Sequence, residues 1–298
     1  MTLPSWNDGP ARAAVLDYLA RIGDVPVAER VAVVDNDGTL WCEQPAYLQA
    51  LFILERLGEQ AAGDPRLAAR PVVQALLAGD LAAATQDGPG PMLEVLLDTH
   101  AGLTTEEFEA AVADWIGRFR HPRFDVPVSG LVYQPMLELL DVLRDHDFRV
   151  FLVTGGGVEF VRAVSDRIYG VARDDVVGSA VEVAVARRDG RMVLVRQPTL
   201  AGSPNEGAPK VQSIQARIGR RPIVAVGNSA GDREMLEYAQ TGQRPSLCLV
   251  VDHDDAEREY AYAGAAVTDP HAEPITDTAR ARGWTIVSMR RDWARVFP

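Results

Sequence analysis

Two carboxylates one residue apart, Asp35 and Asp37, directly follow the apolar run Val31-Ala-Val-Val and precede Gly38. A buried strand that ends in acid is typical of the place where open α/β sheets bind ligands. Burying two carboxylates this close together is costly unless they share a proton or a cation. A hard divalent cation such as Mg²⁺ prefers oxygen ligands and would meet that need. The alternative is a strand followed by an ordinary polar turn, because Asp-Gly is a common turn sequence.

The pair of acids also suits phosphoryl transfer. Asp35, the first acid after the strand, could attack phosphorus and form an aspartyl-phosphate. Asp37 could protonate the leaving oxygen and later deprotonate the attacking water. One carboxylate cannot do both tasks well, which gives a chemical reason for two.

A second candidate turn is Thr154-Gly155-Gly156-Gly157, after the apolar run Phe148–Val153. The Thr154 hydroxyl could donate to a phosphoryl oxygen, and the glycines would let the backbone approach an anion at a helix N-terminus. The same glycines could equally serve tight packing. Lys210, at the start of an expected helix, is typical of a solvated charge and is unfavourable at the positive end of a helix dipole unless an anion binds there.

The third turn, Gly227-Asn-Ser-Ala-Gly-Asp232, follows another apolar run. Asn228 could offer a neutral oxygen to Mg²⁺. Asp232 could bind the ion directly or orient a water on it, and either residue could instead only stabilise the turn, with Asp232 as a helix N-cap. Both residues are therefore candidate metal ligands.

The elements that carry these turns alternate between strand and helix. This alternation predicts a doubly wound, mostly parallel Rossmann-like α/β sheet, whose polar turns meet at one edge. The segment from Ala46 to about His121 has helical periodicity and is too long for a loop, so we expect an inserted all-helical cap. The predicted domains are a core of residues 1–43 and 123–298 and a cap of residues 44–122. Two alternating stretches, Val176–Ala186 and Met192–Val195, predict an antiparallel hairpin.

Bulk properties exclude some classes of partner. The 298 residues carry a formal net charge of -12, which argues against binding to nucleic acid or to an anionic membrane. Two cysteines do not make a disulfide framework, and neither a signal peptide nor an apolar run of about 18 residues is apparent. These features predict a cytoplasmic protein. Nothing in the sequence predicts its oligomeric state.

Taken in order, the stretches Val31–Leu40, Thr154, Lys210 and Gly227–Asp232 resemble the four motifs of the haloacid dehalogenase superfamily. With its second acid, Asp37, the first motif resembles that of the phosphatase members, because the dehalogenases lack this acid. The helical block resembles the cap that phosphoserine phosphatase-like members carry after the first motif.

This resemblance implies that Asp35 is the nucleophile and Asp37 the general acid and base. It also implies that Asp35, the Asp37 carbonyl and the fourth motif bind Mg²⁺, and that Thr154 and Lys210 hold the phosphoryl group, with Gly155 and Gly156 beside it. The fourth motif departs from the family, since Asn228 stands where an Asp is usual. Glu43 lies near the family's substrate-reading Glu but one residue out of register, so we expect it at the substrate without assigning phosphoserine.

The resulting expectation is a Mg²⁺-dependent phosphomonoester hydrolase that acts on a small phosphorylated metabolite. A phosphotransferase or phosphomutase with the same aspartyl-phosphate is an alternative, because only the acceptor differs. A catalytically silent binding protein is a further alternative, supported by Asn228 alone.

Overall fold

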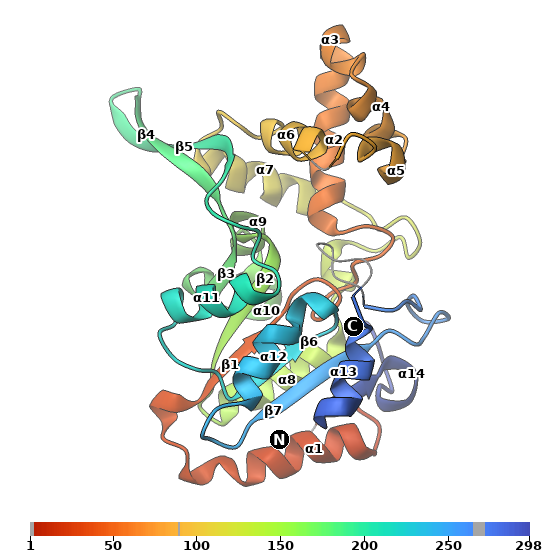
Figure 1. Cartoon of the computed structure of the whole chain (residues 1–298), viewed down its shortest axis with the longest axis vertical. Coiled ribbons are helices and arrows are strands. Elements are labelled where there is room, and N and C mark those ends of the chain that lie inside the picture. Colours follow the sequence, from red (N-terminus) through yellow and green to blue (C-terminus); the bar gives the residue numbers. More distant parts are fainter. Residues whose placement is uncertain (1–2, 89, 265–271) are drawn as a thin grey trace. The chain divides into compact units, whose positions relative to one another are not determined.

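A parallel sheet of six strands, in the order β3-β2-β1-β6-β7-β8, organises the larger of two units (Figure 1). The strand order runs outward from β1 in both directions, so the fold is doubly wound and the predicted fold class is confirmed. The strands are β1 (Val31–Val34), β2 (Arg149–Gly157), β3 (Val176–Ser179), β6 (Val224–Gly227), β7 (Leu247–Asp252) and β8 (Thr285–Ser288).

The computed structural model describes residues 3–88, 90–264 and 272–298. The larger unit comprises the described residues of Met1–Gln44, Phe119–Ser179 and Pro204–Pro298. The smaller unit comprises those of Pro45–Arg118 and Ala180–Ser203.

Helices cover the sheet of the larger unit. All four residues of β1 are buried, as expected for a strand enclosed on both faces. One face of the sheet packs against Ile214, Met235 and Ala279, which belong to three different helices, and Figure 1 shows α12 and α13 in front of β6 and β7. The helices are α1 (Pro10–Ala20), α8 (Gln134–Asp145), α9 (Val158–Arg162), α10 (Ser165–Tyr169), α11 (Ala208–Arg217), α12 (Arg233–Gln240), α13 (Ile275–Arg282) and α14 (Met289–Asp292).

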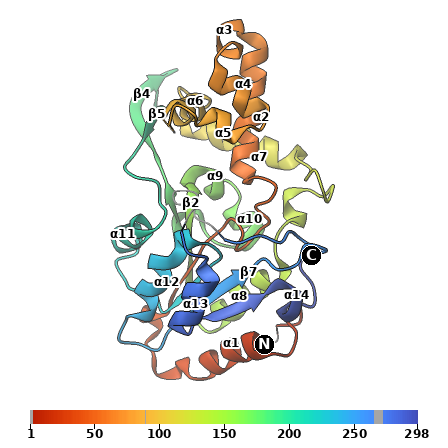
Figure 2. The same cartoon turned by 45° about the vertical axis from the view of Figure 1, so that its right-hand side comes forward.

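The smaller unit combines helices with one hairpin. In Figures 1 and 2, α4 and α5 lie beside α2, and Leu57, Val73 and Val95 are among the buried residues of the core that the helices share. Residue Thr104 forms a bridge to Val195, which ties the hairpin to this unit. The elements are α2 (Leu48–Gly63), α3 (Pro65–Ala68), α4 (Pro71–Leu77), α5 (Leu81–Ala84), α6 (Gly90–Asp98), α7 (Thr105–Arg118), β4 (Val181–Arg188) and β5 (Arg191–Leu200).

One predicted strand divides into two. The stretch Val176–Ala186 becomes β3, which pairs in parallel with β2, and β4, which pairs with β5 in the expected hairpin. Gly178 fits the first pairing, because a Cβ there would lie 2.9 Å from the Gly156 carbonyl oxygen. Alternation of apolar residues shows that a segment is extended but does not show which strand it will pair with.

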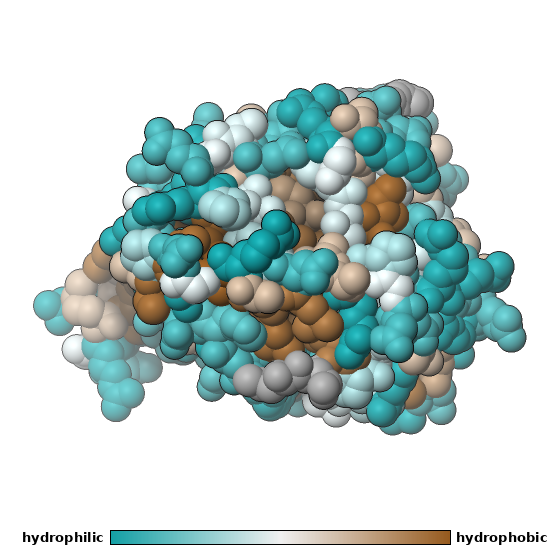
Figure 3. Space-filling model, turned by 90° about the horizontal axis from the view of Figure 1, so that it is seen from below, coloured by the Kyte–Doolittle hydropathy of each residue, from teal (hydrophilic) through white to brown (hydrophobic). Residues whose placement is uncertain are grey.

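The face of the molecule seen in Figure 3 is largely polar. Hydrophilic side chains cover most of it, with smaller apolar patches between them. None of the helices in the described part of the chain is long and apolar enough to cross a membrane. The two cysteines, Cys42 and Cys248, are both buried and free.

Candidate active site

The carboxyl ends of three neighbouring strands carry the predicted turns. Strand β1 pairs with β2 on one side and with β6 on the other. Asp35 directly follows β1, Asn228 directly follows β6, and Thr154 lies in the last part of β2. The Asp35 backbone N–H donates to the Val226 carbonyl oxygen at 2.9 Å, which fixes the first turn against β6. Asp35, Thr154 and Asn228 are buried. The sheet thus brings the three turns together.

Lys210 lies between two carboxylates. Its Nζ is 2.6 Å from Asp35 Oδ1 and 2.6 Å from Asp232 Oδ1, and its side chain is 2% exposed. It is therefore not the solvated charge that its position on a helix start would suggest. Burial lowers the pKa of the Lys210 ammonium, but the charges of Asp232 and Asp35 outweigh burial and raise the pKa above its usual value. Burial, and then the Asp232 charge, raise the pKa of Asp35 against the opposing effect of Lys210.

Both oxygens of Asp232 are occupied by the chain's own donors. Oδ1 accepts from Lys210, while Oδ2 accepts from the backbone N–H groups of Asn228 at 3.0 Å and Ser229 at 3.1 Å. Gly227 makes room for this, because a Cβ there would lie 2.4 Å from Asp232 Cγ. Asp232 thus holds Lys210 and the third turn in place.

Asn228 presents its two polar ends to different neighbours. Its Oδ1 accepts from Thr39 Oγ1 at 3.1 Å, and its Nδ2 donates to Glu43 Oε1 at 3.1 Å. Thr39 Oγ1 also lies 3.4 Å from Asp35 Oδ2, so Thr39 links the first and third turns. Sequence reasoning missed Thr39, although its place two residues after Asp37 was a signal that it shares the turn.

Asp37 is held by neutral donors. Trp41 Nε1 donates to its Oδ1 at 2.8 Å, and Asn36 Nδ2 donates to Oδ2 at 3.4 Å. Burial raises the pKa of Asp37, while the hydrogen bonds from Trp41 and Asn36 oppose that rise. The two acids of the first turn therefore have different surroundings, since Asp35 faces an ammonium and Asp37 faces an indole and an amide.

The glycine-rich turn is the end of β2. Gly156 N–H donates to Thr154 Oγ1 at 2.9 Å, and the Gly155 carbonyl oxygen accepts from Ser179 Oγ at 2.7 Å. Asn205 Nδ2 donates to the Thr154 carbonyl oxygen at 2.9 Å. A hydrogen bond between the side chains of Thr154 and Asp37 lowers the pKa of Asp37. The helix that follows, α9, has only five residues.

Glu43 is buried beside the third turn rather than exposed to solvent. Burial raises the pKa of the Glu43 carboxyl to about 8, and the charges of Asp37 and Asp35 act in the same direction. The Tyr262 hydroxyl and the Asn228 amide lower that pKa. The carboxyl group lies on the Asn228 side of the turn, where its Oε1 accepts from Asn228 Nδ2.

A buried contact between His253 and Glu259 supports the first turn from outside the predicted motifs. His253 Nε2 lies 2.7 Å from the Gly38 carbonyl oxygen, and His253 Nδ1 lies 3.2 Å from Glu259 Oε2. Burial raises the pKa of Glu259, but the contact with His253 opposes burial and the pKa is lowered overall. The His253 ring thus joins Gly38 to Glu259. Nothing local in the sequence signals this pair, because topology alone brings it to Gly38.

The donor set fits a hard divalent cation. Once His253 and Glu259 are set aside as a pair, the connected cluster holds the carboxyls of Asp35, Asp37, Glu43 and Asp232 against the single ammonium of Lys210. Within the described ranges, no group of three or more His, Cys, Asp or Glu side chains has the arrangement of a metal site. The predicted ligands are of another kind, since they include the Asn228 amide oxygen and a backbone carbonyl, both of which suit Mg²⁺.

Comparison with known proteins gives a family and a fold. Residues 32–237 match the model of the haloacid dehalogenase-like hydrolase family. A protein of unknown function from Bordetella pertussis Tohama I is 19% identical, with a TM-score of 0.50 over 87% of this chain and 98% of that one. A conserved, functionally unknown protein from Anaerococcus prevotii DSM 20548 is 13% identical, with a TM-score of 0.56 over 93% of this chain and 91% of that one. Among curated proteins, none matches the sequence.

Proposed function

The chain belongs to the haloacid dehalogenase-like hydrolase family, and we propose that it is a magnesium-dependent phosphatase of small phosphorylated metabolites. The proposed reaction passes through an aspartyl-phosphate on Asp35. The observation that carries the proposal is the buried contact of 2.6 Å between Lys210 Nζ and Asp35 Oδ1. The second acid of the same turn, Asp37, has different neighbours, since it accepts from the Trp41 indole.

The proposed nucleophile is Asp35 Oδ2. Oδ1 is held by Lys210, whereas the contact of Oδ2 with Thr39 is longer, at 3.4 Å. Attack by Oδ2 forms a phosphorus–oxygen bond while the ester bond to the substrate breaks, and the leaving oxygen takes the Asp37 proton. Water then attacks the phosphorus, Asp37 accepts its proton, and the bond to Asp35 breaks to release inorganic phosphate. Burial favours the protonated form of Asp37, which the first step requires.

Thr154 and Lys210 are the proposed phosphoryl contacts. Thr154 Oγ1 accepts from Gly156 N–H, which leaves the hydroxyl proton for an acceptor such as Asp37 or a phosphoryl oxygen. Lys210 uses two of its three N–H donors on Asp35 and Asp232, and the third can reach a phosphoryl oxygen. Phosphoryl transfer depends mainly on such positioning and charge.

Asp35, the Asp37 carbonyl and Asn228 Oδ1 are the residues that would hold Mg²⁺. Asp232 is the less suitable ligand, because Lys210 and two backbone N–H groups hold its oxygens, whereas Asn228 Oδ1 accepts from the Thr39 hydroxyl, which can rotate toward Asp35 instead. When bound, the ion would offset the charge of the phosphoryl oxygens and of the buried acids.

The test is phosphate release from a panel of small phosphomonoesters and an aryl phosphate, with Mg²⁺ or with EDTA. We expect activity in wild type with Mg²⁺, loss of at least about 1,000-fold in Asp35→Asn, and no change in Asp17→Asn, which alters an exposed acid of α1. Turnover that survives either EDTA or Asp35→Asn contradicts the proposal. Labelling of Asp35 without phosphate release, unless an alcohol acceptor is added, would instead indicate a phosphotransferase.

A further inference from the structure

The Asn228 amide has one orientation that satisfies its neighbours. Its oxygen faces the Thr39 hydroxyl at 3.1 Å and its nitrogen faces Glu43 Oε1 at 3.1 Å. Turned by 180°, the amide would set its oxygen against Glu43 Oε1, so two acceptors would lie in contact once Glu43 is ionised, as it would be beside a bound cation. His253 Nε2, at 3.5 Å from Asn228 Nδ2, donates to Gly38 and offers no acceptor in its place. Glu43 therefore selects the orientation of the amide.

We infer that Glu43 is a positioning residue of the magnesium site, which turns Asn228 Oδ1 toward the cation and supplies the negative charge that this neutral ligand lacks. This inference rests on the proposed function. A carboxylate that accepts from the far end of a ligand makes the ligand's donor atom more basic, as outer carboxylates do for metal-bound histidines. Here the amide of Asn228 would transmit the effect from Glu43 to the ion.

The local packing is built around this contact. Gly38 has a φ of +70°, and a Cβ there would lie 2.0 Å from Asn228 Nδ2 and 2.6 Å from Glu43 Oε1. Only glycine leaves room for the two side chains to meet beside the first turn. Glu43 is 7% exposed, and its Oε1 accepts from Asn228 Nδ2.

The test is binding of Mn²⁺, followed by electron paramagnetic resonance, and of Mg²⁺, followed by calorimetry, both without substrate. We expect Glu43→Gln to bind both ions about tenfold more weakly or worse, because it keeps the shape but loses the charge. Asn228→Asp combined with Glu43→Gln should restore binding to the wild-type level, because the charge then sits on the ligand and the amide introduced at position 43 can donate to it. Glu94→Gln, an exposed change in α6, is the matched control and should bind as wild type.

Stability without metal separates this role from damage to the fold. Glu43→Gln keeps an oxygen that can accept from Asn228 Nδ2, so in EDTA the variant should unfold at the wild-type temperature or above it. If wild type and Glu43→Gln bind the ions equally well while Asn228→Ala binds them more weakly, the inference about Glu43 is overturned. The proposed metal site is then still supported. A change in substrate KM with unchanged ion affinity would overturn it in favour of a substrate contact. A wild type that binds neither ion would overturn the proposed metal site itself.

Discussion

Trp41 sets the state of Asp37 through one hydrogen bond. The indole is fully buried and packs against Phe160 and Tyr169, with ring centroids 6.5 Å and 5.9 Å away. Its indole N–H, 2.8 Å from Asp37 Oδ1, adds a chemical role to this packing. The bond stabilises the ionised form of Asp37 and so lowers its pKa.

Trp41→Phe should therefore raise the pKa of Asp37 while keeping an aromatic ring in the pocket. A proposed general acid with a higher pKa stays protonated to higher pH, so the alkaline limb of kcat/KM should move to higher pH. The measurement is the pH profile of phosphate release. Trp6→Phe is the control, because it also loses an indole hydrogen bond, to the Pro135 carbonyl oxygen, but lies outside the cluster. An unmoved alkaline limb in Trp41→Phe would contradict the role assigned to Asp37.

The residues of the candidate site differ in how well they could be predicted from the sequence. Asp35 and Asp37 stand out because two acids directly follow an apolar run. The role of Lys210 can be inferred only from its contacts with Asp35 and Asp232. Those two acids come close to it because strands that are distant in the sequence pair in parallel. His253 has no local signature, because its partner, the Gly38 carbonyl, is more than 200 residues away along the chain. Roles that depend on such tertiary partners cannot be predicted from spacing alone.

At the scale of elements, the turn after β1 depends on Gly38. Its φ of +70° is one that residues with a side chain rarely adopt, and an added Cβ would collide with Asn228 and Glu43. The His253 ring also contacts the Gly38 carbonyl oxygen, at 2.7 Å. The turn therefore has little freedom to shift away from a collision.

Gly38→Ala should lower the free energy of unfolding by more than about 2 kcal/mol, through backbone strain and the displaced side chains. It should also weaken Mg²⁺ binding, because Asn228 and Glu43 must move. Urea denaturation and calorimetry measure the two effects. Gly23→Ala is the control, since a Cβ there meets nothing within 4 Å, and it should change stability by less than about 0.5 kcal/mol. Wild-type stability in Gly38→Ala would show that the turn is looser than its contacts indicate.

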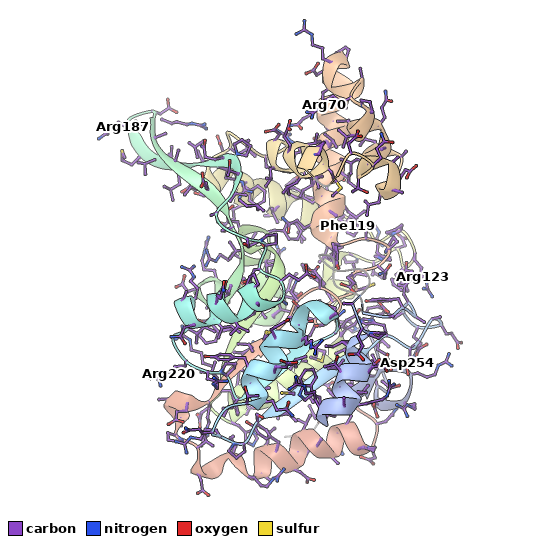
Figure 4. The ribbon with its side chains drawn as sticks, viewed as in Figure 1. Arg70, Phe119, Arg123, Arg187, Arg220 and Asp254 are labelled. Carbon is purple, nitrogen blue, oxygen red and sulfur yellow. The ribbon has the colours of Figure 1, made fainter. Side chains whose placement is uncertain are left out.

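The hairpin illustrates a limit of prediction for whole elements. The two strands of the hairpin are joined within Arg187-Arg-Asp-Gly190, and Figure 4 shows Arg187 at the tip. Val185 pairs with Leu194 in register, and both side chains are exposed, at 67% and 41%. Alternation of apolar and polar residues normally indicates a strand with one buried face. In this hairpin the apolar side chains are exposed to solvent instead. The pattern therefore did not distinguish β3, which belongs to the main sheet, from β4. The domain boundaries stay a prediction.

At the scale of the whole molecule, the excess of buried acid couples folding to pH. The pKa of Asp35 is raised, and that of Glu43 is raised to about 8. In the unfolded chain both groups titrate near pH 4. Between about pH 4 and pH 8 the folded protein therefore binds more protons than the unfolded chain, and stability must fall as pH rises through that window. A divalent cation binds the ionised carboxylates and should reverse this trend.

We therefore expect the free energy of unfolding in EDTA to decrease from pH 5 to pH 8 by more than about 1.4 kcal/mol, the equivalent of one pKa unit. With saturating Mg²⁺ the decrease should shrink or vanish, so the stabilisation by Mg²⁺ should grow with pH. Urea denaturation at pH 5, 6.5 and 8, with and without the ion, measures both trends. In Glu43→Gln one of the two groups no longer titrates, and the slope in EDTA should be shallower. A stability in EDTA that rises with pH over this range would mean that the acids are ionised without metal, and that Lys210 alone balances the site.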